Sequence, residues 1–139
     1  MQKLGRHGLG VLLVSLLVAC AGQPTVETTL EEKLAAKGYA LAEPVTSVRD
    51  WSLNGWVYVD DRHFIMESGV RDRYLVTLRQ RSLELGSAVN LAFSTTVGSL
   101  TDKDKVILRG AGGFRETLMI ASLHALKRIE KEAPQDPSP

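Results

Sequence analysis

Strand-type patterning in the middle of the chain limits the folds it can adopt more than any other feature of the sequence. From Val48 onward, short runs rich in aromatic and β-branched residues alternate with polar segments at Asp60–Arg62 and Ser68–Asp72. Such segments are typical of the turns that join antiparallel strands. The pattern therefore predicts a three-stranded meander. Its strands are expected at Trp56–Val59, His63–Met66 and Arg73–Leu78.

Two further strands are expected in the second half of the chain, and the C-terminal segment is ambiguous. Val89–Phe93 alternates apolar with small or polar residues, and Lys105–Leu108 follows a polar turn. Within Glu116–Glu132 the apolar residues lie on one helical face, although the first part also suits a strand. We expect a strand at about Arg115–Ser122 and a short C-terminal helix after it, with an all-helical segment as the alternative.

A short helix is expected at the start of the domain. Thr29 and Glu32 have the spacing of a capping box, and Gly38 is a typical helix stop. Tyr39–Pro44 is expected to be a connector, because the residue before a proline disfavours helix. These elements predict an α+β domain with a mostly antiparallel sheet of about five or six strands and short N- and C-terminal helices.

The first twenty residues have the anatomy of an export signal. Basic Lys3 and Arg6 precede an uncharged apolar run over Leu9–Ala19, and small residues lead into Cys20. The run is too short for a membrane-spanning helix, which needs about 20 apolar residues. We therefore expect residues 1–19 to be removed as a signal peptide.

The sequence Leu17-Val18-Ala19-Cys20 resembles the lipobox of bacterial lipoproteins. The resemblance implies that fatty acids such as palmitate are attached to Cys20 and that the chain is cut before it. Several acyl chains anchor a protein far more firmly than one. The residue after Cys20 is Ala21. By resemblance to the sorting pattern of enteric lipoproteins, in which Asp at this position favours retention in the inner membrane, Ala21 favours the outer membrane. The expected location is the cell envelope, on the periplasmic side of the outer membrane in preference to the inner membrane. An ordinary secretory signal with a chance cysteine is the alternative.

Loss of the signal would leave 120 of the 139 residues, which suits one small domain. Residues 20–28 are small and polar, so we expect a lipid-anchored linker there. Residues 29–132 form the expected α+β domain. The proline-containing residues 133–139 are expected to be a disordered tail.

Charge and cysteine content exclude several classes of function. Removing Lys3 and Arg6 from 17 basic residues leaves 15 against 16 acidic ones, so the formal charge is near −1 and no nucleic-acid partner is expected. Cys20 is the only cysteine in the chain. If it is acylated, the domain has neither a disulfide nor a reactive thiol and must be held together by packing.

Three motifs follow one another within residues 47–126. Gly55-Trp56 opens the hairpin, Tyr74–Leu78 precedes a small residue and Leu85, and Asp104–Ile107 forms a late strand. This order resembles a family of small bacterial envelope lipoproteins built on a domain of unknown function.

The resemblance implies cysteines at the positions that Ser82 and Leu118 occupy in this chain. If those cysteines normally pair, this chain lacks a cross-link that contributes about 2–4 kcal/mol, and burial of Leu118 has to compensate. The family carries no established activity, so the resemblance implies no catalytic residue and no cofactor.

Asp60, Asp61 and His63 are the candidates for a metal site, because carboxylate oxygens and imidazole are common metal ligands. One turn supplies too few ligands for a closed site, and aspartate is common in turns for its local hydrogen bonds. The sequence therefore favours a solvated turn over a metal site.

Candidate nucleophiles lack a catalytic motif. None of the serines stands in a Gly-x-Ser-x-Gly elbow, and spacing alone does not join them to the candidate bases His63 and His124. A hydrolase is therefore the least favoured function. The serines considered are Ser82, Ser94, Ser99 and Ser122.

Two groups of side chains could form a partner surface. Trp56 and Tyr58 are expected mainly in the core, with an exposed aromatic platform as the alternative. Arg71 and Arg73 are expected at a solvated strand edge, and the alternative is a patch for anionic lipid head groups, extended by two later arginines. The later arginines are Arg79 and Arg81.

These features favour a non-catalytic interaction or assembly module that is anchored to the membrane by its lipid. The expected partner is a protein of the cell envelope. A periplasmic lipoprotein that binds a small ligand or a metal is the alternative. No cofactor is expected.

Overall fold

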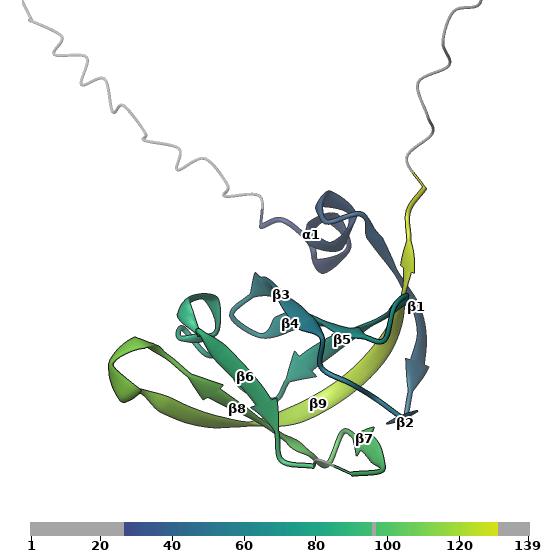
Figure 1. Ribbon diagram of the computed structural model, residues 1–139. Coiled ribbons are helices and arrows are strands. Elements are labelled where there is room, and N and C mark those ends of the chain that lie inside the picture. Colours follow the sequence, from purple (N-terminus) through teal and green to yellow (C-terminus); the bar gives the residue numbers. More distant parts are fainter. Residues whose placement is uncertain (1–26, 96, 131–139) are drawn as a thin grey trace, which may run out of the picture.

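Seven antiparallel strands form one curled sheet, and a short helix lies against it (Figure 1). The structure, a computed structural model, describes residues 27–95 and 97–130. The strand order is β3-β4-β5-β9-β8-β6, and β1 also pairs with β9. The strands of this sheet are β1 (Tyr39–Val45), β3 (Gly55–Asp60), β4 (His63–Ser68), β5 (Asp72–Leu78), β6 (Asn90–Phe93), β8 (Lys105–Arg109) and β9 (Arg115–Arg128).

Smaller elements complete the described chain. Strands β2 (Ser47–Arg49) and β7 (Ser99–Thr101) form a separate two-stranded sheet, and 3-10 turns occupy Leu85–Ser87 and Ala111–Gly113. No helix in the described ranges is long and apolar enough to cross a membrane. The expected signal peptide, Cys20, most of the expected linker and the expected tail lie outside the described residues.

The predicted meander is confirmed. β3, β4 and β5 are consecutive neighbours, with Trp56 opposite Met66 and Ile65 opposite Leu75. β6 and β8 confirm the two strands predicted around residues 89–93 and 105–108. The sheet-rich architecture is broadly consistent with the α+β expectation, although helices are few.

Strand β9 is the centre of the sheet and corrects the expectation for the C-terminal segment. It continues to Arg128, where the sequence indicated a helix after Ser122. β5 pairs along one edge of β9, and β8 and β1 share the other edge. The C-terminal helix and the all-helical alternative are both wrong, because three strands bind the backbone of this segment.

A bulge in β9 explains its helix-like spacing. Thr77 pairs with Ser122, but the next residue, Leu78, pairs with Ile120, so β9 contains one extra residue here. The bulge places Ile120 and Leu123 in the same core cluster. Ile120 and Leu123 are three residues apart, and apolar residues at this spacing in a sequence indicate one face of a helix.

Strand β1 replaces the connector expected at Tyr39–Pro44. It pairs with β9 from Tyr39 to Val45, with a register shift between Leu41 and Pro44. Among the described strands β1 pairs with β9 alone, so its other side is an edge, where a proline without an N–H is tolerated. Pairing with the distant β9 therefore stabilises β1 as a strand, although its local sequence does not indicate a strand.

Helix α1 (Leu30–Ala36) confirms the helix predicted at the start of the domain. The Thr29 hydroxyl accepts a hydrogen bond from the Glu32 N–H, and the Glu32 carboxylate accepts one from the Thr29 N–H, which completes the capping box. Gly38 follows with φ of +85°, a left-handed conformation that favours glycine. Leu34 is the residue that α1 buries against the sheet.

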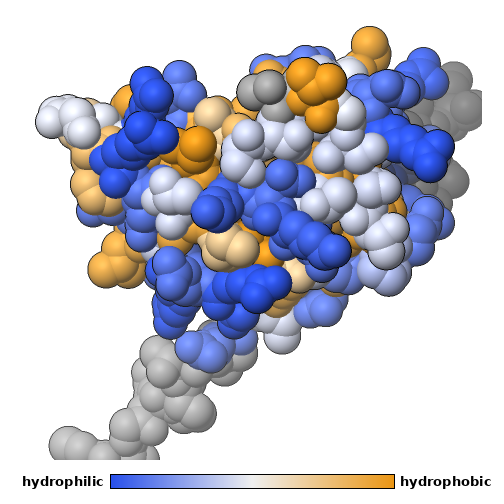
Figure 2. Space-filling view, turned by 90° about the horizontal axis from the view of Figure 1, so that it is seen from below, coloured by the Kyte–Doolittle hydropathy of each residue, from blue (hydrophilic) through white to orange (hydrophobic). Residues whose placement is uncertain are grey.

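Two apolar clusters occupy opposite faces of the sheet. Along β4, Phe64 and Met66 belong to the larger inner cluster, whereas Ile65 packs with Leu34 and Leu75 in the outer cluster. The alternation follows from the two-residue period of a strand. On the surface seen in Figure 2, apolar residues are interspersed with charged ones, so that face carries no broad apolar patch.

Candidate functional site

The turn between β3 and β4 brings together the acidic residues and the histidine that the sequence indicated. His63 Nδ1 lies 2.7 Å from Asp60 Oδ1, and the Arg62 N–H donates to the same oxygen at 3.0 Å. Lys33 of α1 donates to Asp60 Oδ2 at 2.9 Å. Asp60 therefore links its own turn to the helix.

Asp61 has different partners. The Tyr58 hydroxyl donates to its Oδ1 at 2.8 Å, and Arg81 donates to its Oδ2 at 3.1 Å. The hydrogen bond from Tyr58, followed by that from Arg81, lowers the pKa of Asp61, and the same Tyr58–Asp61 bond raises the pKa of Tyr58. The Asp61 carbonyl also accepts from the Ser82 N–H at 2.7 Å, so the chain after β5 returns to this turn.

A pocket of about 370 Å³ opens over the turn, and its charges are balanced. Each oxygen of Asp60 and Asp61 already accepts a hydrogen bond from a neighbouring donor. Within the described ranges, no group of three or more His, Cys, Asp or Glu residues has an arrangement that could hold a metal ion. The three sequence candidates instead belong to an ion-pair network, with Lys33 and Arg81 as partners that the sequence did not reveal.

The ion pairs of Asp60 predict a loss of stability in acid. Partial burial raises the pKa of Asp60, but hydrogen bonds from Lys33, the Arg62 backbone and His63 outweigh this effect and lower the pKa from 3.8 to about 2. A carboxyl whose pKa is depressed in the folded state stabilises the fold above its unfolded pKa, and this contribution disappears as pH falls toward the folded pKa. Solvent screening limits it to about 1 kcal/mol.

Urea unfolding of the wild type and Asp60→Asn near neutral pH and near pH 2.5 measures this contribution. Between the two conditions we expect the wild type to lose about 0.5–1 kcal/mol more than Asp60→Asn. Asp102→Asn is the control, because no hydrogen bond to the Asp102 carboxylate occurs in the described part of the chain. Equal acid sensitivity of the wild type and Asp60→Asn would contradict the prediction.

Trp56 and Tyr58 share the inner face of the sheet. Both side chains are half-buried and pack against the inner cluster, and the Trp56 ring meets Phe64 edge-on with centroids 6.2 Å apart. The expectation that these aromatics belong mainly to the core agrees with this arrangement. The face that the two side chains share is the packed one, and each side chain keeps a part of its surface exposed.

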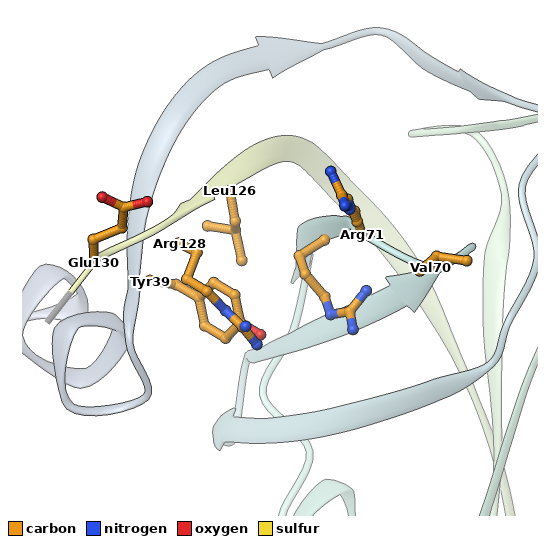
Figure 3. A pocket seen from close by; sticks show the side chains of 7 residues that line it. Tyr39, Val70, Arg71, Leu126, Arg128 and Glu130 are labelled. Carbon is orange, nitrogen blue, oxygen red and sulfur yellow. The ribbon is translucent and has the colours of Figure 1, made fainter.

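Arg71 and Arg73 line a second pocket, which sequence reasoning did not foresee. The pocket has a volume of about 430 Å³ and lies where β1 begins, β5 begins and β9 ends. Arg128, Tyr39 and Glu130 add to its polar lining (Figure 3). The sequence placed Arg128 in a helix, so nothing in the expected structure connected it with the other two arginines.

The other two arginines of the run lie elsewhere. The Arg79 Nε donates to the Ile120 carbonyl at 3.1 Å, and Arg81 binds Asp61 in the turn network. The four arginines therefore do not form one patch. Arg71 and Arg73 alone contribute to the second pocket.

The hydroxyl and imidazole candidates do not combine into a catalytic pair in the described part of the chain. The Ser82 hydroxyl donates to Glu116, and the Ser94 hydroxyl donates to Asp104. His63 contacts Asp60, and the Nδ1 of His124 is buried without a hydrogen-bond partner. No hydrogen bond joins a serine to a histidine among residues 27–95 and 97–130.

Comparison with known proteins assigns the chain to a family. The pattern of a family of unknown function, DUF6491, matches residues 4–136. The chain belongs to this family. No curated protein and no solved structure matches it. Family membership therefore agrees with the domain of unknown function that the motifs suggested and supplies no activity.

The two positions at which the sequence resemblance implied cysteines are both buried in this DUF6491 member. Ser82 is 2% exposed and Leu118 is fully buried. Leu118 belongs to the inner cluster. The Ser82 hydroxyl donates to Glu116, which precedes Leu118 by two residues in β9. Apolar packing and a polar contact occupy these positions in the absence of a cross-link.

Proposed function

We propose that this chain is a lipid-anchored protein of the bacterial cell envelope and that it acts as a non-catalytic interaction or assembly module. The observation that carries the proposal is the lipobox-like Leu17–Cys20, which follows an apolar run with a basic start. The family match begins at residue 4 and so takes in this segment as well as the domain. Acylated Cys20 is the membrane anchor.

The short connection to the domain supports a role close to the membrane. Six residues separate Cys20 from Glu27, where the described chain begins. The seven Cα–Cα steps from Cys20 to Glu27 span at most about 25 Å when the chain is fully extended. The domain then works within that distance of the bilayer, and Ala21 favours the periplasmic side of the outer membrane.

The side-chain contacts favour binding over catalysis. Asp60 and Asp61 are engaged by neighbouring donors, and the Ser82 hydroxyl by Glu116. Groups held in such contacts position elements of the fold. An exported module whose polar residues serve its own structure acts through its surface.

Palmitate labelling and membrane fractionation test the anchor. We expect the wild type to incorporate labelled palmitate and to sediment with membranes, because Cys20 carries the acyl chains. Cys20→Ser is expected to lose the label completely, whereas Gln23→Ala, three residues away, keeps it. Unlabelled wild-type protein released into the periplasm would overturn the proposal, and membrane separation distinguishes outer from inner membrane.

The interaction role needs a second experiment. Proximity labelling from the wild-type chain in intact cells is expected to mark the same envelope proteins in replicate cultures. Cys20→Ser is expected to lose this set, because it removes the domain from the membrane. A wild-type sample without any reproducible envelope protein contradicts the role.

A second candidate function is binding of a small ligand in the periplasm. The pocket lined by Arg71, Arg73 and Arg128 favours it, because three cations face one shared space. A thermal-shift screen of small molecules tests this function. The expected result is ligand-dependent stabilisation of the wild type, and its absence for every ligand class removes the candidate.

A further inference from the structure

The arginine pocket is built by three segments that are distant in the sequence. Tyr39 begins β1, Arg71 and Arg73 stand at the β4–β5 turn and the start of β5, and Arg128 ends β9. Figure 3 shows Tyr39 and Arg128 on one side of the pocket and Arg71 on the other. The volume, about 430 Å³, lies within the range of small-molecule sites.

The pocket has an excess of positive charge. Three arginines line it against one glutamate, Glu130. Neither Arg71 nor Arg128 lies within ion-pair distance of a carboxylate in the described ranges. Their guanidinium groups therefore keep donors available to a ligand.

Arg73, which lines the same pocket, is held in place by the protein itself. Its side chain is 17% exposed, and its Nε is buried 3.4 Å from Glu67 Oε1 without a hydrogen-bond acceptor in good geometry. One terminal nitrogen donates to the Asp72 carbonyl at 2.9 Å. These contacts orient the guanidinium before any ligand arrives, which reduces the entropy that binding has to overcome.

The chemistry of the lining selects a class of ligand. Guanidinium groups bind phosphate and carboxylate oxygens through paired hydrogen bonds. A phosphate monoester carries about −1.5 to −2 charges and three strong acceptor oxygens, whereas a carboxylate carries one charge and two oxygens. Three arginines around one space fit the phosphate better. Leu126 and the Tyr39 ring add apolar area for the rest of the ligand.

We propose that this pocket binds a phosphate monoester group, which Arg71, Arg73 and Arg128 hold and Tyr39 contacts. The inference rests on the second candidate function and names its ligand class. The phosphate belongs either to a soluble compound or to the head group of an anionic lipid. The lipid source also fits the proposed anchor, because the pocket belongs to a domain tethered near a bilayer.

Titration calorimetry of the full chain in a neutral detergent tests the site. The probes are inorganic phosphate, dihexanoylphosphatidic acid below its micellar concentration, and acetate as the carboxylate control. We expect saturable binding of at least one phosphate probe, about tenfold tighter than that of acetate. Arg128→Gln and Arg71→Gln change exposed residues and are expected to weaken binding about tenfold each, whereas Arg109→Gln on β8 leaves it unchanged.

The outcomes separate the sources and the hypotheses. Tighter binding of phosphatidic acid than of inorganic phosphate supports a lipid head group, and equal binding supports a soluble phosphate compound. Absence of saturable phosphate binding, or binding that Arg128→Gln and Arg71→Gln leave intact, overturns the inference. In that case, stabilisation by another ligand class in the thermal-shift screen still supports ligand binding as the second candidate function. Absence of any stabilisation contradicts both the phosphate site and that function.

Discussion

Replacing Phe64 with alanine is expected to lower the free energy of unfolding by about 3–5 kcal/mol. Phe64 is fully buried in β4, which has neighbours on both sides. Its ring contacts Trp56 edge-on and lies 6.4 Å from the ring of Phe93. Truncation removes apolar contacts and leaves a cavity. The cavity cannot easily close, because strands on both sides hold β4 in place. A loss of this size is a large part of the total stability of a small domain.

Urea unfolding followed by tryptophan fluorescence measures the effect, because Trp56 reports on the altered site. Phe64→Leu, which keeps most of the buried volume, is expected to cost clearly less than Phe64→Ala. Val70→Ala is the surface control, since Val70 is 90% exposed. A loss below about 1 kcal/mol for Phe64→Ala would show that the inner cluster does not depend on this ring.

Leu34→Ala is expected to cost about 2–4 kcal/mol and to release α1 from the sheet. Leu34 is the buried residue of a helix of only seven residues, and it packs in the outer cluster with Ile65 and Leu75. A helix this short is not stable in isolation and depends on tertiary packing. The Lys33–Asp60 ion pair alone, which is partly exposed, is too weak to hold it.

Hydrogen exchange distinguishes local release from global unfolding. In Leu34→Ala we expect amides of α1 to lose protection to a greater extent than those of β4 and β5. The control is Ala36→Ser, an exposed position on the same helix, with an effect of at most about 0.5 kcal/mol. Unchanged protection of α1 in Leu34→Ala would mean that the helix is held by contacts other than this leucine.

The docking of α1 bears on the proposed anchor. The helix begins ten residues after Cys20, so α1 is the first described element between the proposed anchor and the sheet. Leu34 and the Lys33–Asp60 pair join α1 to β3, β4 and β5. Weakening this contact is therefore expected to loosen the position of the domain relative to the membrane without disturbing the inner cluster.

The sequence was sufficient where structure depends on near neighbours. The β3–β4–β5 meander follows from strand-favouring runs and turn residues, and each pairing joins consecutive segments. The capping box of Thr29 and Glu32 likewise acts within one turn of α1. The Asp60–His63 contact joins residues three positions apart, so its members could be grouped before the fold was known.

Elsewhere the sequence was insufficient because the deciding contacts are distant. β1 is a strand because it pairs with β9, which lies at the other end of the described sequence. Its own sequence, with Pro44, indicates a connector. In β9 a bulge at the Leu78 pairing imitates helical spacing. Lys33 and Arg81 reach the turn network from segments 27 and 20 residues away.

By itself the sequence determined the local elements: the capped helix, the turns of the meander and a single cysteine, Cys20, that leaves the domain without a cross-link. Only the tertiary structure decided that residues 115–128 form one strand and that Arg128 meets Arg71 and Arg73 at one pocket. The reason is physical. Capping and turns depend on hydrogen bonds over a few residues, whereas strand pairing and the arginine pocket require segments that come together only when the sheet closes.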